Sequence, residues 1–145
     1  MNEINTILVG FSATSIHRKQ AREAIILARD NKARLIILSV RDQNVSQMVA
    51  NITKDRGFLG RDVVKKLAED IKKDRDDLIE HRLAMVETEA AKRDIDFKTL
   101  KVKGDFEKCV PFYAKKFAAD LIIVDASNKS LSQLSKSCNC EIRPI

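Results

Sequence analysis

Short apolar runs recur along the chain and predict a set of strands. Three runs are apolar at nearly every position: residues 4–11, 35–40 and 121–124. Such runs are typical of strands that are buried on both faces of a sheet. Residues 97–102 instead alternate apolar side chains with lysines, which predicts a strand at an edge of the sheet. Residues 141–145 (EIRPI) form a last short strand, and Pro144 assigns it an edge position because proline cannot donate to a sheet.

Between the strands, apolar residues recur with the spacing of amphipathic helices. The helical segments predicted from this spacing are residues 16–30, 45–53, 61–93, 106–117 and 130–137. In the first of them Ala21, Ala24 and Ala28 lie on one face, and their small side chains allow close packing on a sheet. Asn31 is predicted to end this helix in the left-handed conformation. Pro111 is predicted to kink the fourth helix, and the last segment has room for only about two turns.

This alternation of strands and helices predicts one α/β domain over residues 1–145. The expected architecture is an open parallel sheet of five strands, with right-handed crossovers and helices on both faces. In such a sheet, ligands bind at the carboxyl ends of the strands, beside the point where the strand order reverses. The polar loop of Ser127, Asn128, Lys129 and Ser130 follows the fourth strand at such a place. The loop is a candidate anion-binding site, with Lys129 as a point charge, or a cap for the following helix.

Residues 61–93 form the longest periodic segment and carry two apolar stripes. The first stripe comprises Val64, Leu67, Ile71, Leu78 and Met85, and the second comprises Ile79, Leu83, Val86 and Ala90. Charges of both signs fill the remaining positions and indicate a solvated helix surface. Two stripes are more apolar surface than one sheet face covers. We therefore expect the second stripe, near Ile79, Leu83 and Val86, to contact a second subunit or the loop at residues 56–60 (RGFLG).

Composition excludes several classes of protein. The 145 residues are 44% hydrophobic and 33% charged, which is typical of a folded domain and not of a disordered chain. No apolar stretch approaches the ~20 residues of a membrane helix, and the first ten residues lack the basic region of a signal peptide. Three cysteines, an odd number, predict free thiols in a reducing compartment, so we expect the protein in the cytoplasm.

The net charge of +6 raises the question of nucleic-acid binding. The basic excess is spread over several segments, and aromatic residues make up only 5% of the chain, with no Trp. Stacking platforms for single strands are therefore scarce. A mildly basic, solvated surface is the better interpretation, and we expect no nucleic-acid partner.

No arrangement of residues in the sequence indicates catalysis. The chain has no Gly-x-Ser-x-Gly elbow, Walker loop or His-Glu-x-x-His motif, and Ser12 has no identifiable His and acid in register. Cys138 and Cys140 form a Cys-x-Cys pair, but a zinc site needs four ligands and Cys109 is the single thiol left to add. We therefore expect neither an enzyme nor a metal site, and we interpret the pair as buried cysteines. A thiol or metal sensor is the competing hypothesis.

Two stretches resemble the universal stress protein family. The opening ILVGFSATSIHRKQAREAIILARDNKARLIILSV is similar to the family's strand-helix-strand start. The later stretch KGDFEKCVPFYAKKFAADLIIVDAS is similar to its helix that begins with Gly-Asp and ends with Ala-Asp before a buried strand. The resemblance implies a Rossmann-like fold of the adenine nucleotide alpha hydrolase type, here with a shortened last helix. It also implies a homodimer that acts in stress response through an unidentified protein partner.

Many members of the family bind ATP or AMP, and the resemblance identifies the corresponding positions here. Val40 matches the valine near the adenine and Gly104 matches the glycine that starts the third helix, whereas Ser12 stands where the family has an Asp. The places of the family's phosphate-binding loop hold Asp125, Asn128, Cys138 and Asn139. The three glycines of that loop are thus absent, although backbone N–H groups need glycine to approach phosphates closely.

We therefore expect a binding or regulatory module without strong ATP binding. The alternative is a nucleotide-binding switch that takes ATP or AMP at the carboxyl edge of the sheet. Its candidate residues are Gly10, Ser12, Val40, Gly104, Ser127, Asn128, Lys129 and Ser130.

Family dimers commonly pair their last strands antiparallel, and the resemblance implies the same for residues 141–145. Pro144 cannot donate a hydrogen bond there, and the strand is short. Glu141 is placed to meet Arg143 of the partner subunit, for about 0.2–1 kcal/mol per pair. We expect a homodimer that uses this edge weakly and draws further support from packing elsewhere.

Overall fold

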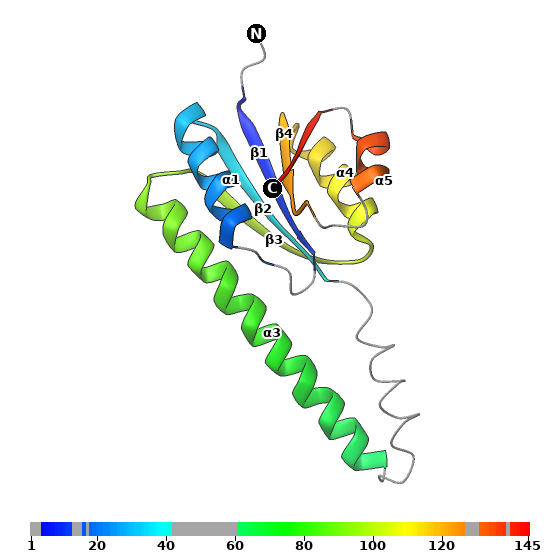
Figure 1. The fold of residues 1–145 in the computed structure, drawn as a ribbon. Helices are drawn as coiled ribbons and strands as arrows, with labels where there is room; N and C mark the ends of the chain where they lie inside the picture. Colours follow the sequence, from blue (N-terminus) through cyan, green and yellow to red (C-terminus); the bar gives the residue numbers. More distant parts are fainter. Residues whose placement is uncertain (1–3, 13–15, 17, 42–60, 127–130, 139) are drawn as a thin grey trace.

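The computed structural model describes residues 4–12, 16, 18–41, 61–126, 131–138 and 140–145. Five strands within these residues form one parallel sheet with the order β3-β2-β1-β4-β5 (Figure 1). The strands are β1 (Thr6–Ser12), β2 (Arg34–Arg41), β3 (Phe97–Lys103), β4 (Leu121–Val124) and β5 (Glu141–Pro144). The predicted α/β class is confirmed, and β3 and β5 lie at the two edges, as their sequences predicted.

Helices cover both faces of the sheet. They are α1 (Arg18–Asn31), α3 (Arg61–Lys92), α4 (Phe106–Lys116) and α5 (Leu131–Ser137). Figure 1 shows α1 and one end of α3 on one face, and α4 with α5 on the other. The helix predicted at residues 45–53 lies outside the described residues, and α4 continues through Pro111, whose kink stays a prediction. None of the described helices is both long and apolar enough to cross a membrane.

The sheet separates two apolar cores because the side chains of each strand alternate between its faces. In β2, Leu35 and Ile37 belong to the core beneath α1 and α3, whereas Ile36, Leu38 and Val40 belong to the core beneath α4 and α5. The side chains of β1 and β4 divide in the same way. These strands are buried on both faces, which is why their sequences are apolar without interruption.

The end of α1 differs by one residue from the prediction. Asn31 is the last helical residue, and its side-chain amide donates to the carbonyl oxygen of Leu27 at 2.8 Å. Lys32 adopts the left-handed conformation instead, with a φ of 52°. The N–H of Ala33 then donates to the carbonyl oxygen of Ala28 at 2.9 Å, which satisfies a free carbonyl of the last turn.

The long helix α3 corrects another prediction. Its second stripe is buried in the same core as α1: Ile79, Leu83, Val86 and Ala90. The expectation that this stripe is left for a second subunit is wrong, because the protein's own sheet covers it; residues 56–60 lie outside the described residues. In the first stripe, Leu67, Leu78 and Met85 are exposed. The 32 residues of α3 correspond to about 48 Å, and much of the helix extends beyond the sheet in Figure 1.

Candidate functional site

The strand order reverses between β1 and β4, and one buried side chain lies where their carboxyl ends separate. The pairing of these two strands ends at Val9 and Ile123. There the amide Nε2 of Gln20, on α1, donates to the carbonyl oxygens of Gly10 at 2.7 Å and of Ile123 at 3.2 Å. Gln20 is only 1% exposed. It therefore joins two strands at the point where parallel α/β sheets bind their ligands.

The orientation of the Gln20 amide follows from its partners. Both partners are carbonyl oxygens, which only accept, so the NH₂ group must face them. The oxygen Oε1 is buried and accepts no hydrogen bond from a described residue. Sequence reasoning missed Gln20. The available signal was a polar residue four positions before Ala24, on the alanine face of α1.

Gly10 lies at this edge in close contact with α4. A Cβ at this position would be 3.2 Å from Cζ of Phe106 and 3.4 Å from Cγ2 of Val110. A Cβ here would force these side chains to shift by a few tenths of an ångström, so glycine favours the close approach of the helix to the strand. Val40 belongs to the same core as Phe106 and Val110, and it is 1% exposed. Ser12, the partner of Val40 in the register of β1 and β2, is partly exposed.

Gly104 connects β3 to α4 with a backbone that requires glycine. Its φ is +146°, a conformation that residues with a Cβ rarely adopt, and a Cβ would lie 3.2 Å from Sγ of Cys109. The N–H of Gly104 donates to the carbonyl oxygen of Arg41 at 3.0 Å. Asp105 occupies the N-cap position of α4, but its carboxylate makes no capping hydrogen bond and lies 3.5 Å from Nζ of Lys108.

The structure thus brings part of the predicted site together. Ser12 and Val40 are neighbours across β1 and β2, and Gly104 follows the next strand at the same edge. The predicted loop at residues 127–130 lies outside the described residues. Its anion-binding role, its alternative capping role, and the ligand role of the other candidate residues stay predictions.

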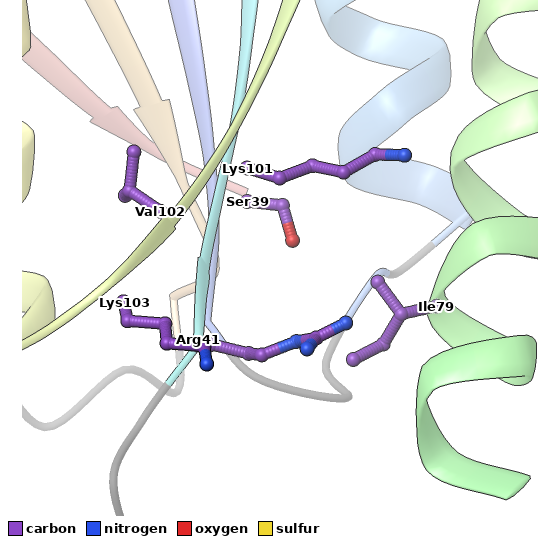
Figure 2. Close-up of a pocket in the computed structure, with 6 residues that line it drawn as sticks. All are labelled: Ser39, Arg41, Ile79, Lys101, Val102 and Lys103. Atoms are coloured by element: carbon purple, nitrogen blue, oxygen red, sulfur yellow. The ribbon is translucent and has the colours of Figure 1, made fainter. Parts of the chain in front are cut away.

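A small cleft lies at the carboxyl ends of β2 and β3, on the side of α3 (Figure 2). It is lined by Ser39, Arg41, Ile79, Lys101, Val102 and Lys103. Figure 2 shows the Ser39 hydroxyl between the side chains of Lys101 and Arg41, which run from the strands toward α3. The volume of about 120 Å³ is well below the 300–1,000 Å³ of typical cofactor sites. The cleft is therefore too small for a nucleotide.

Acidic residues of α3 partly neutralise the cations of this cleft. Arg41 Nη2 lies 3.0 Å from Oδ1 of Asp76, and Nζ of Lys101 lies 2.6 Å from both carboxylate oxygens of Glu80. Partly exposed pairs of this kind contribute about 0–1 kcal/mol each. They connect α3 to the two strands. The lysines of β3 were the sequence signal for this contact. Their alternation with apolar residues had served only to predict an edge strand.

The three cysteines are free and partly buried. Burial raises the pKa of the Cys109 thiol above its ordinary value, and the carboxylates of Asp105 and Glu107 raise it further. Burial likewise raises the pKa of Cys138 and of Cys140. Thiols with raised pKa values are poor nucleophiles at neutral pH. Within the described part of the chain, no three His, Cys, Asp or Glu residues gather as a metal site.

Comparisons with known proteins agree with this geometry. Residues 3–136 match the model of the Universal stress protein family. Universal stress protein UspA from Lactobacillus plantarum is 20% identical, with a TM-score of 0.66, and the match covers 100% of this chain and 99% of that chain. No curated protein matches the chain.

Among the solved structures of similar fold, some contain a nucleotide. The universal stress protein from Archaeoglobus fulgidus in complex with dAMP is 13% identical, with a TM-score of 0.63, covering 99% of each chain. A universal stress protein family protein from Arabidopsis thaliana with AMP bound is 12% identical, with a TM-score of 0.57, covering 97% of this chain and 90% of that chain. At these identities the likeness shows the Rossmann-like fold and leaves the ligand of this chain open.

Proposed function

Because the chain belongs to the universal stress protein family, as the match over residues 3–136 shows, we propose that it is a cytoplasmic binding and regulatory module. In this proposal it acts in stress response as a non-catalytic homodimer, through contacts with a protein partner. Strong binding of ATP is not part of its function.

The observation that carries this proposal is the packing of α4 over the predicted adenine side of the site. Phe106 and Val110 lie against Gly10, and Val40 is buried in the same core. An adenine ring placed against Gly10 or the Val40 side chain would have to displace these side chains from a close-packed interior. Displacing packed core side chains costs about 1–3 kcal/mol, which weakens binding by about 5- to 150-fold.

The phosphate side of the site supports the same proposal. Asp125 follows β4 where the family's loop has its first glycine. A carboxylate at this place repels phosphate, and a Cβ keeps ligand oxygens away from the backbone N–H groups. Both effects disfavour the anionic part of ATP more than the neutral part of the molecule.

A second candidate function is the nucleotide-binding switch. It is favoured by two structures of similar fold, one in complex with dAMP and one with AMP bound. The partly exposed Ser12 and the buried amide of Gln20 provide polar groups near the point where the strand order reverses. A monophosphate places less negative charge near Asp125 than ATP does. This candidate therefore predicts AMP as the preferred ligand.

Nucleotide retained during purification separates the two candidates. The protein is purified without added ligand, denatured with acid, and the supernatant is analysed by liquid chromatography with mass detection. We expect far less than one adenine nucleotide per chain. An amount close to one per chain would contradict the proposal and establish the nucleotide-binding switch.

The proposed homodimer uses the outer edge of β5. Ile145 donates to the carbonyl oxygen of Val124 and accepts from the N–H of Ala126, both at 2.9 Å, so its backbone groups point toward β4. Because these groups alternate along a strand, those of Ile142 and Pro144 point outward. Pro144 has no N–H, so the edge offers a partner few hydrogen bonds. We therefore propose that this edge contributes only part of the association.

The ion pair expected across this edge has a partner within the same chain. Nη2 of Arg143 lies 3.3 Å from Oε1 of Glu141 of its own strand. A pair to the partner subunit would have to replace this contact. The net gain is therefore at the low end of about 0.2–1 kcal/mol.

A further inference from the structure

Large apolar side chains are exposed along one line of α3. Leu67, Leu78 and Met85 are 41%, 42% and 50% exposed, and they are three of the four exposed large hydrophobic residues in the described part of the chain. Ile71 lies on the same line and is partly buried. We call these four residues the outer stripe. Ile71, Leu78 and Met85 follow one another at intervals of seven, the repeat of a helix that pairs with another helix.

The outer stripe is separate from the face with which α3 contacts its own sheet. At about 100° per residue, the outer stripe points roughly 115° away from the direction shared by Ile79, Leu83, Val86 and Ala90. The two faces are therefore distinct. A second helix can lie on the outer stripe while α3 stays packed on the sheet.

The charges beside the outer stripe indicate which helix fits. With Ile71 and Leu78 at position a of the heptad, Asp70 and Asp77 occupy position g, and Arg75 occupies position e. In a parallel pair of identical helices, position g contacts position e of the following heptad in the partner. Asp70 then faces Arg75 of the partner subunit, and Asp77 faces Arg82 of the partner subunit.

An antiparallel pair of the same helices is disfavoured. In such a pair, position g of one helix faces position g of the other, and position e faces position e. Asp70 and Asp77 then approach aspartates of the partner helix, and Arg75 approaches an arginine, so like charges repel. We infer that the outer stripe binds α3 of a second copy of this chain, with the two helices parallel and in register.

Two polar positions limit the strength of this pairing. Asp74 and His81 occupy position d, where each side chain faces its own copy across the two-fold axis. Two carboxylates at one such place repel each other. The pairing is therefore reversible and weaker than that of a coiled coil with apolar residues at these positions.

This contact is independent of the proposed β5 edge and of nucleotide binding. α3 packs beside β3, at one end of the strand order, and β5 lies at the other end. One two-fold axis does not pass through both places. A chain that uses both contacts assembles beyond a dimer, and loss of either contact leaves the other intact.

Cross-linking tests the orientation directly. In a background with Cys109, Cys138 and Cys140 replaced by Ser, the variant Leu67→Cys places one thiol near the start of the stripe. Parallel helices bring the two thiols together, so mild oxidation should convert most of the protein into covalent dimer. The control Glu69→Cys places an exposed thiol two residues away on another face and should form at least about tenfold less dimer. Equal yields from both variants, or none from Leu67→Cys, would overturn the inference.

Light scattering across protein concentrations tests the stripe and its charges in the full chain. Leu78→Glu should raise the dissociation constant of the α3 pairing at least about tenfold. Phe112→Glu, at a residue of α4 that is 62% exposed, should leave that constant unchanged. Asp70→Arg should weaken association, and Asp70→Arg combined with Arg75→Asp should restore it. A chain that is monomeric at every concentration, a partner protein bound in place of the second copy, or no rescue by the double variant would each contradict the parallel pairing.

Discussion

The side-chain amide of Gln20 donates a hydrogen bond of 2.7 Å to the carbonyl oxygen of Gly10. This contact joins the start of α1 to the carboxyl end of β1, and the same nitrogen also reaches β4. A buried donor shared between two strands fixes their separation where the strand order reverses. The architecture of the candidate site therefore depends on a residue outside the apolar pattern.

Replacing this amide should destabilise the fold. Gln20→Leu keeps the approximate volume but leaves two carbonyl oxygens without a donor, so the free energy of unfolding should fall by about 1–3 kcal/mol. Urea denaturation followed by circular dichroism measures the change. The matched control Gln133→Leu, on the exposed side of α5, should change stability by less than about 0.5 kcal/mol. Equal losses in the two variants would show that the hydrogen bonds of Gln20 contribute nothing.

The contact between Gly10 and α4 predicts a size-dependent effect. Gly10→Ala places a Cβ 3.2 Å from Phe106, and this overpacking should lower the free energy of unfolding by about 1–3 kcal/mol. Adding Phe106→Leu removes the ring atoms that clash, so the double variant should be more stable than the sum of the two single losses predicts. Additive losses, measured by the same denaturation experiment, would show that the two positions do not touch.

The two stripes of α3 should respond differently to the same substitution. Leu83→Ala empties a buried place in the sheet core and should cost about 2–5 kcal/mol of unfolding free energy. Leu78→Ala removes an exposed side chain and should cost less than about 0.5 kcal/mol when measured at a concentration where the protein is monomeric. Thermal unfolding of both variants compares them. A larger loss of stability for Leu78→Ala than for Leu83→Ala would show that the first stripe, and not the second, packs in the core.

The raised pKa values of the cysteine thiols predict how stability depends on pH. A thiol with a raised pKa keeps its proton in the folded chain at pH values where the unfolded chain has lost it. Unfolding therefore releases protons, and stability should fall as the pH rises above the ordinary thiol pKa of 9.0. The variant with all three cysteines replaced by Ser should show a smaller fall between pH 8.5 and about 10. An identical pH profile for both proteins would contradict the raised pKa values.

Thiol reactivity tests the sensor hypothesis separately. Because burial disfavours the thiolate, iodoacetamide should label Cys138 and Cys140 at pH 7.5 more slowly than it labels the urea-unfolded chain. Mass spectrometry of timed samples measures both rates. Faster labelling of the folded protein would support a thiol sensor in place of two structural cysteines.

Much of this fold could be predicted from the sequence because the strands are buried on both faces. An uninterrupted run such as residues 121–124 has few alternatives to a central strand, and β4 has these bounds. The lysines of β3 and Pro144 of β5 identified the edges for equally direct reasons. The residues within each strand determine whether it is central or at an edge, so each position could be predicted from one segment of the sequence.

Features that depend on tertiary packing could not be predicted from single segments of the sequence. The two stripes of α3 are equally apolar, and only the packed structure shows that Leu83 faces the sheet and Leu78 faces outward. Gln20 reads as an ordinary polar helix residue until two strand ends are placed beside it. For the candidate site, the family resemblance located Ser12 and Val40, while the packing of Phe106 over Gly10 became visible only in three dimensions.

The central claim is that this member of the family does not bind ATP strongly, and calorimetric titration tests it most directly. ATP and AMP are titrated with and without magnesium into the full chain, and dAMP into the Archaeoglobus fulgidus relative as a positive control. The Asp125→Gly variant serves as the matched test of the carboxylate at the phosphate side. We expect no dissociation constant below about 10 μM for the unmodified chain. A value below about 10 μM for ATP would contradict the account and assign the chain to the nucleotide-binding switches.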